Sequence, residues 1–129
     1  MNGSVDDNKG ARALAEALKK NEALQRLGID GTFDECARAL AEALKVNASL
    51  TTLILGSEYD GKNMIGPEGG VALAEALKVN AVLTNLNLEG NNLTNYDRDL
   101  TGITALAEAL KVNAVMTSVT LDGQALPVK

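Results

Sequence analysis

The feature that most constrains this sequence is an eight-residue segment that occurs four times. ALAEALKK occupies residues 13–20, and ALAEALKV recurs at residues 39–46, 72–79 and 105–112. An asparagine follows every copy, and successive asparagines are 26, 33 and 33 residues apart (Asn21, Asn47, Asn80 and Asn113). Such a period predicts a stack of similar units, because a unit of this size cannot bury its apolar face alone.

Each unit joins two patterns of different period. Leucines four residues apart, such as Leu40 and Leu44, share one face of a helix, and Ala and Leu are strong helix formers. An L-x-x-L-x-L pattern then begins three residues after the asparagine, and its alternating second half is typical of a short, half-buried strand. We therefore expect four helix–strand units, roughly residues 5–31, 32–57, 58–90 and 91–126, in a single domain, residues 1–129, which can also be part of a longer array.

Stacking these units places parallel strands in one layer and helices in another. Strands lie ~4.8 Å apart in a sheet, whereas packed helices need ~8–10 Å, so the stack is expected to curve. The sequence thus predicts an α/β fold, a curved solenoid with a parallel sheet on the concave face and helices on the convex face. The asparagine after each helix is expected in a left-handed conformation, and Glu16–Lys19 and its copies are expected to pair on the outer surface.

The third copy of the L-x-x-L-x-L pattern, together with the helix pattern after it, resembles the leucine-rich repeat family, in its ribonuclease-inhibitor-like subtype. That subtype has the pattern L-x-x-L-x-L-x-x-N-x-L followed by G-x-x-x-L-x-x-x-L, and this stretch supplies nearly all of it (Leu83, Leu86, Leu88, Asn91, Leu93, Gly102, Leu106 and Leu110). The repeats look most like those of NLR-type receptors and of bacterial or protist repeat proteins. The resemblance implies a horseshoe fragment that binds proteins, and it also allows a relative of GTPase regulators.

The composition excludes several kinds of chemistry. The chain has no His and one Cys, which removes His-dependent catalysis, His metal sites and an intrachain disulfide. Cys36 stands where other units have Gly10 and Gly69, so we expect a buried structural thiol. A net charge of −5 argues against nucleic acid, and no apolar run approaches the ~20 residues that span a bilayer. We expect a cytoplasmic protein that is not an enzyme, with no cofactor, metal site, nucleic-acid partner or membrane partner.

The strand-to-helix loops are where the units differ. The first loop is about two residues shorter than the pattern, and loops 56–70 and 89–102 are each about five residues longer. In the second loop, Asn63 and Ile65 are candidates for the displaced Asn and Leu of the pattern. Acidic residues near the helix starts are expected to cap them and to complement the helix dipole (Asp34, Glu35, Glu68 and Asp99).

Two surfaces are candidate protein-binding sites. The first is the concave sheet face, with outward strand positions and residues just past the strands (Arg26, Thr52, Ile54, Asn85, Asn87, Ser118, Thr120, Asp30, Glu89 and Asp122). The same face is expected to hold Thr51, Thr84 and Thr117. The second surface is the rim of strand-to-helix loops (Phe33, Tyr59, Asp60, Tyr96 and Arg98). For the aromatic residues, the alternative that each ring covers the core beneath its own loop stays open.

These observations favour a non-catalytic protein–protein interaction module that binds a partner through the concave sheet face or the loop rim. The alternative is a structural, self-assembling or designed repeat scaffold without a natural ligand, since the helical units are nearly identical. Both ends of the stack lack a polar capping repeat, and the last expected strand, from Met116 to Leu121, lies at a sheet edge. We therefore also expect self-association through the uncapped ends.

Overall fold

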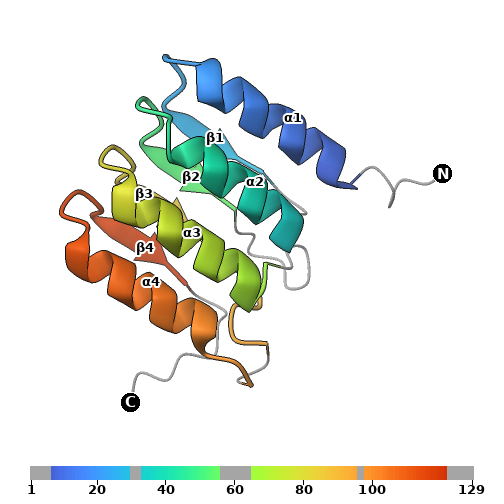
Figure 1. Cartoon of the computed structure of the whole chain (residues 1–129), viewed down its shortest axis with the longest axis vertical. Helices are drawn as coiled ribbons and strands as arrows, with labels where there is room; N and C mark the ends of the chain where they lie inside the picture. The colour runs from blue at the N-terminus through green and yellow to red at the C-terminus, as the bar shows by residue number, and fades with distance from the viewer. Residues whose placement is uncertain (1–6, 30–32, 56–64, 96–97, 122–129) are drawn as a thin grey trace.

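Helices and strands alternate along the chain in its computed structural model (Figure 1). The structure describes residues 7–29, 33–55, 65–95 and 98–121. The helices are α1 (Asp7–Lys20), α2 (Asp34–Leu44), α3 (Pro67–Val79) and α4 (Thr101–Val112). The strands are β1 (Arg26–Gly28), β2 (Thr52–Ile54), β3 (Asn85–Asn87) and β4 (Ser118–Thr120). The described residues thus form four helix–strand units, as the repeat predicts.

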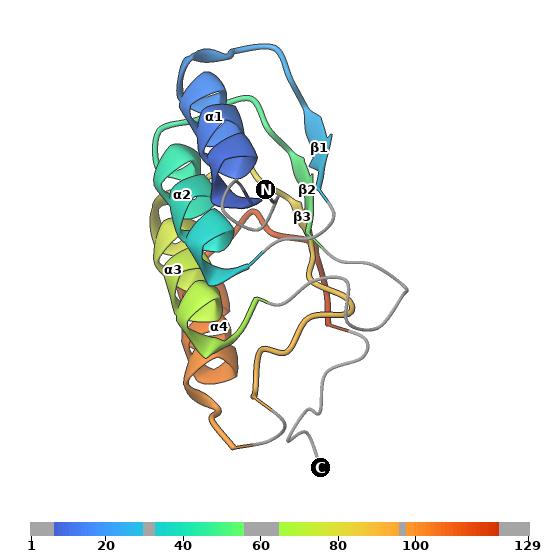
Figure 2. The ribbon, with the colours of Figure 1, turned by 90° about the vertical axis from the view of Figure 1, so that its right-hand side faces the viewer.

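The four strands form one parallel sheet in chain order, β1-β2-β3-β4. Equivalent positions of the units face one another, since Arg26 pairs with Thr52 and Thr52 with Asn85. The helices lie side by side as a second layer along the sheet (Figure 2). One neighbour relation, repeated from unit to unit, therefore builds the whole domain. The curvature expected from the packing widths stays a prediction.

A layer of leucines lies between the helices and the sheet. The paired helix leucines of the two middle units are 0–1 % exposed (Leu40, Leu44, Leu73 and Leu77). Burial of one such side chain stabilises a fold by about 1.5–3 kcal/mol relative to its exposure, so this layer is the main source of stability. Its thinness explains why the framework uses Leu and Ala almost alone.

The asparagines that follow the helices do not adopt the left-handed conformation expected for them. Asn80 (φ −83°, ψ 128°) and Asn113 (φ −91°, ψ 121°) have extended backbones. The physical reason is that the side chain caps the helix of the neighbouring unit. Asn80 Nδ2 donates to the carbonyl of Leu44 at 2.8 Å, and its Oδ1 accepts the N–H of Leu83 at 2.7 Å.

This arrangement recurs at all three interfaces between the described units. The Nδ2 groups of Asn47, Asn80 and Asn113 each donate to a leucine carbonyl of the preceding helix, at 2.7–2.8 Å (Leu18, Leu44 and Leu77). Each Oδ1 accepts the N–H groups two and three residues later. We call Asn21, Asn47, Asn80 and Asn113 the asparagine ladder. Because a buried polar side chain must find its partners, the ladder fixes the register of one unit on the next.

The helix starts approach each other closely where the sequence has glycine. A Cβ atom on Gly69 would lie 2.6 Å from Oδ1 of Asp34 and 2.6 Å from Cγ2 of Ile65. Ile65 itself is fully buried, as expected for the displaced leucine of its loop. Cys36 occupies the equivalent position in α2 and is buried, which confirms the prediction of a buried thiol.

Candidate protein-binding surface

The outward positions of the strands form two rows across the sheet. One row is Arg26, Thr52, Asn85 and Ser118, and the other is Gly28, Ile54, Asn87 and Thr120. The middle residues of β2 and β3 are leucines fully buried under the helices, so the flanking side chains point away from the helices. The structure therefore brings seven of the predicted sheet-face residues onto one surface.

The threonines just before the strands form hydrogen bonds within the sheet. Oγ1 of Thr51 donates to the carbonyl of Gln25 at 3.0 Å. Thr84 donates to the carbonyl of Thr51 at 3.2 Å, and Thr117 repeats the bond to Thr84 at 3.1 Å. The hydroxyl protons of these threonines are therefore used between strands, and their place in a partner-binding face stays a prediction.

Most of the outward side chains on the strands themselves have no hydrogen-bond partner among the described residues. Within the described residues, five predicted sheet-face side chains make no hydrogen bond or ion pair (Arg26, Thr52, Asn85, Ser118 and Thr120). We call these five the sheet-face set. Asn87 differs, since its Oδ1 accepts the N–H of Glu89 at 2.8 Å and so orders the turn after β3. Ile54 adds a half-buried apolar surface among the polar groups.

Only part of the predicted loop rim lies within the described residues. Phe33 precedes α2 and is 38 % exposed, and Arg98 is exposed. Phe33 thus stays partly accessible rather than fully covering the core. The remaining rim residues and two of the sheet-face residues lie outside the described residues (Tyr59, Asp60, Tyr96, Asp30 and Asp122). For these five the assignment stays a prediction.

The loops beside the sheet are supported by bonds that differ from unit to unit. Asn91 is buried, and its Nδ2 donates to the carbonyls of Leu55 and Leu88, each at 3.0 Å. Its Oδ1 accepts the N–H of Ile65 at 3.0 Å. Asn91 therefore ties the loop before α3 to the loop after β3.

Asp34 caps the neighbouring helix rather than its own. Its Oδ1 accepts the N–H of Gly66 at 2.7 Å and that of Gly69 at 2.9 Å, both at the start of α3. Asp99 acts locally, as expected, and accepts the N–H of Thr101 at 2.9 Å. Hydrogen bonds from the Thr101 side chain and then its backbone hold the pKa of the Asp99 carboxyl below its usual value.

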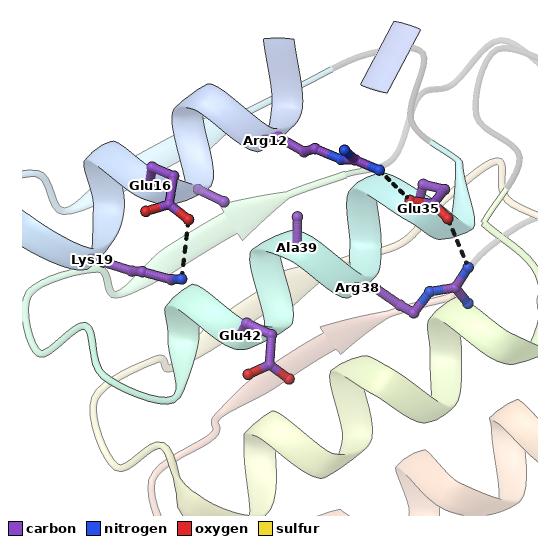
Figure 3. Close-up of a pocket in the computed structure, with 8 residues that line it drawn as sticks. Arg12, Glu16, Lys19, Glu35, Arg38, Ala39 and Glu42 are labelled. Atoms are coloured by element: carbon purple, nitrogen blue, oxygen red, sulfur yellow. Dashed lines mark hydrogen bonds and ion pairs between the residues drawn. The ribbon is translucent and has the colours of Figure 1, made fainter. Parts of the chain in front are cut away.

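The outer helix surface carries a chain of ion pairs, part of which is drawn in Figure 3. Arg12 on α1 meets Glu35 at 3.0 Å, Glu35 meets Arg38 at 3.3 Å, and Arg38 meets Glu68 on α3 at 2.9 Å. The hydrogen bond from Arg12, followed by that from Arg38, lowers the pKa of Glu35. Bonds to Glu68 and then Glu35 raise the pKa of Arg38. These acids therefore pair with arginines instead of capping α2 and α3.

The predicted pairs within the helices are confirmed. Each of the four copies joins a lysine Nζ to a glutamate three residues earlier, at 3.1–3.4 Å (Glu16–Lys19, Glu42–Lys45, Glu75–Lys78 and Glu108–Lys111). All are exposed, so each contributes only a few tenths of a kcal/mol, roughly. The helix surface is thus filled by internal ion pairs, whereas the sheet face is not.

Metal-binding clusters and membrane-spanning helices are absent from the part of the chain that the structure describes. There, no three His, Cys, Asp or Glu side chains gather closely enough to hold a metal ion. No described helix combines the length and the apolar character that crossing a membrane requires.

The alternating units, the parallel sheet in chain order and the leucine layer define a leucine-rich-repeat solenoid of the ribonuclease-inhibitor-like kind. Two solved structures share the fold. Actin-binding site 2 of leiomodin-1 matches with a TM-score of 0.75 and 25% identity over 94% of this chain. The C-terminal domain of tropomodulin from Caenorhabditis elegans matches with a TM-score of 0.72 and 19% identity over 89% of it.

This chain spans 65% and 66% of the lengths of those two chains, so it corresponds to a part of each. Neither neighbour is named as a catalytic domain. No family model and no curated protein matches the sequence. The fold is therefore shown by the structural likeness.

The spacing of the strand residues predicts polar side chains on the sheet face, but it does not separate those that are free from those that are hydrogen-bonded. A signal for this was present in the repeats. Thr51, Thr84 and Thr117 are identical in three units, which is typical of a structural position. The next position varies among the units (Arg26, Thr52, Asn85 and Ser118), as expected where no common structural bond constrains the side chain.

Proposed function

We propose that this chain is a protein-binding module whose partner contacts the sheet-face set. The observation that carries the proposal is the contrast between the first residue of each strand and the residue just before it. Thr51 uses its hydroxyl proton within the sheet, whereas Thr52 has no side-chain partner among the described residues. Hydrogen-bonding groups that the fold leaves unused on a shared surface are available to another protein.

The framework beneath this surface favours binding at low entropic cost. The three interfaces between units share the same asparagine and threonine bonds, so the spacing of the outward side chains is set before a partner arrives. Preorganisation reduces the ordering that binding otherwise requires. Arg26 is the strongest candidate for a dominant contact, because arginine is enriched among interface hot spots.

The structural likeness makes actin the defined partner to test first. One neighbour is itself named as an actin-binding site, and the match covers 94% of this chain. The choice of actin is part of the proposal, and it rests on that neighbour together with the free sheet face.

The experiment measures binding of monomeric actin by isothermal titration calorimetry. The double variant Thr52→Arg/Asn85→Arg places two long cations on the sheet face and is expected to weaken binding at least about tenfold, or 1.4 kcal/mol. The matched control Thr104→Arg adds the same side chain at an exposed position of α4, on the helix layer. Its affinity is expected to stay within about twofold of the unchanged chain.

Three results would contradict parts of this proposal. Equal binding by the double variant and the control would exclude the sheet face. Loss of binding in Phe33→Ser, with the double variant unaffected, would move the site to the loop rim. No heat of binding at two temperatures, with actin on the order of 0.1 mM, would exclude actin as the partner, because the enthalpy of binding changes with temperature.

A further inference from the structure

The two ends of the described stack expose residues that are buried inside it. Leu14 in α1 is 41 % exposed, whereas its equivalents Leu40 and Leu73 are 0 % exposed. At the other end, Leu110 in α4 is 38 % exposed, and its equivalent Leu77 is 1 % exposed. At each end of the stack, therefore, a leucine is exposed that is buried in the inner units. The first end exposes the side of a unit that packs on the preceding unit, and the last end exposes the side that packs on the following unit.

The asparagine ladder is also open at both ends, in complementary ways. Asn21 Oδ1 accepts the N–H groups of Ala23 and Leu24 at 2.8 and 2.6 Å, but its Nδ2 has no acceptor among the described residues. The carbonyls of Leu110 and Asn113 are equivalent to those that accept Nδ2 inside the stack, and no described donor reaches them. The first unit thus has an unused donor, and the last has two unused acceptors.

The sheet shows the same complementarity. At each internal interface a backbone N–H donates to the carbonyl one strand earlier, at 2.8–2.9 Å (Thr51 to Gln25, Thr84 to Thr51 and Thr117 to Thr84). In this series, the N–H of Gln25 has no acceptor and the carbonyl of Thr117 has no donor among the described residues. The ends therefore fit each other, and neither end fits a copy of itself.

Gly10 supplies an independent indication that a helix can pack before α1. Its equivalent Gly69 lies so close to the preceding unit that a Cβ would come within 2.6 Å of Oδ1 of Asp34 and 3.1 Å of the Cβ of Ala37. A Cβ on Gly10 would meet nothing within 4 Å. Position 10 thus keeps the small residue that close packing requires, at a place where the described chain supplies no neighbour.

We propose that a second copy of this chain stacks head to tail on the first, with its α1 and β1 against α4 and β4. Nδ2 of Asn21 in the second copy then donates to the carbonyls of Leu110 and Asn113 in the first. The N–H of its Gln25 donates to the Thr117 carbonyl, and its Leu14 packs beside Leu110. The helices that meet carry the ALAEALK segment that already packs on itself at all three internal interfaces. This contact joins unlike surfaces, so it can propagate beyond two copies.

The test uses two variants that each disable one end. Leu14→Asp blocks the first end and Leu110→Asp blocks the last, and both leucines are already partly exposed, so folding is checked by circular dichroism. In sedimentation velocity the unchanged chain is expected to grow from 13.4 kDa into larger species as its concentration rises. Each variant alone is expected to stay monomeric, with self-association weakened at least about tenfold.

Mixing the two variants gives the decisive measurement. Leu14→Asp retains a working last end and Leu110→Asp a working first end, so the mixture should form a dimer of one copy of each and nothing larger. Val79→Asp, at an exposed position on the side of the stack, is the matched control and should assemble like the unchanged chain. If Leu14→Asp misfolds, Asn21→Asp replaces it, because a carboxylate oxygen still accepts the N–H groups of Ala23 and Leu24 while the free Nδ2 donor is lost.

Two outcomes would overturn the proposal. A chain that remains monomeric at concentrations on the order of 1 mM, where even weak contacts populate complexes, has no such interface. Self-association of Leu110→Asp alone would mean that like ends pair with like. Neither outcome bears on the sheet face, because no residue of the sheet-face set is changed in these variants.

Discussion

The two sides of this solenoid are built by different rules. On the side where helices lead into strands, one asparagine recurs and makes the same bonds at each internal interface. On the side where strands lead into helices, each unit has its own arrangement (Asp34 for α3, Asn91 between two loops and Asp99 for α4). In Figure 1 the first side lies along the C-terminal ends of the helices, and the second side lies along their N-terminal ends.

The difference shows how a repeat protein can keep the register of its units constant while its loops vary from unit to unit. The uniform side sets the register, because a change in one asparagine leaves carbonyl and N–H groups unpaired in two neighbouring units. The varied side tolerates different loop lengths, because each loop is closed by bonds of its own. The two sides should therefore respond differently to substitution, and the following variants test that expectation.

The largest effect is expected on the uniform side. Asn80→Ala would leave the carbonyl of Leu44 and the N–H groups of Val82 and Leu83 without their partner, all near the core. Unpaired buried groups cost about 1–3 kcal/mol each, and part of that cost is relieved by water, so we expect a loss of about 3 kcal/mol in the free energy of unfolding. Urea denaturation with a constant m-value measures it.

The matched control is Asn85→Ala, an asparagine five residues away whose side chain makes no hydrogen bond among the described residues. Its change should lie within about 0.5 kcal/mol of zero, as for a surface substitution. Comparable losses in the two variants would remove the distinction between structural and free asparagines.

A smaller effect, of opposite sign in two equivalent positions, is expected where helices begin. Gly69→Ala would push its Cβ against Asp34 and Ile65, disturb the cap of α3 and cost about 2 kcal/mol. Gly10→Ala places the same methyl group where nothing lies within 4 Å and should stabilise α1 by about 0.5–1 kcal/mol. Thermal unfolding of both variants at a low, fixed concentration checks the sign. A gain for both would show that the start of α3 can relax.

Much of the framework could be predicted from the sequence because it is periodic. The alternation of helix and strand, the parallel sheet, the burial of Cys36 and the Glu–Lys pairs all follow from spacing and residue type. The role of the ladder asparagines could not be obtained in this way. Propensity alone favours a left-handed asparagine, whereas in the stack a neighbouring carbonyl lies within reach of the side chain.

The candidate site was predicted only in outline for a related reason. Spacing shows which strand residues point outward, but it does not show that Thr51 bonds to the strand before it while Thr52 does not. Likewise, nothing local to Asp34 indicates that its carboxylate reaches the start of α3, more than thirty residues later in the chain. Bonds between units depend on the register of the stack, which becomes known only once the units are assembled.

The smallest expected effect is a loss of stability at low pH. The pKa of Asp99 is lowered by Thr101, and that of Glu35 by Arg12 and Arg38. A carboxyl whose pKa is lower in the folded state stabilises the fold above its unfolded pKa, about 3.9 for Asp and 4.3 for Glu. That contribution is lost as the pH falls through the folded pKa. Stability should therefore decline between about pH 5 and pH 3, and Asp99→Asn and Glu35→Gln should each reduce the decline.

The two variants also separate the sides of the comparison. Asp99 caps α4 alone, whereas Glu35 bridges α1 and α2. The difference in acid response between the unchanged chain and Glu35→Gln should therefore shrink when Arg12 is replaced. Melting temperatures at pH 7 and pH 3 measure each response, and Glu22→Gln, an exposed glutamate with no bond among the described residues, is the reference. An unchanged acid response in Glu35→Gln would mean that the arginine bridge does not hold in solution. The ion pair between α1 and α2 would then contribute nothing to the register at that interface, where the asparagine and threonine bonds would remain.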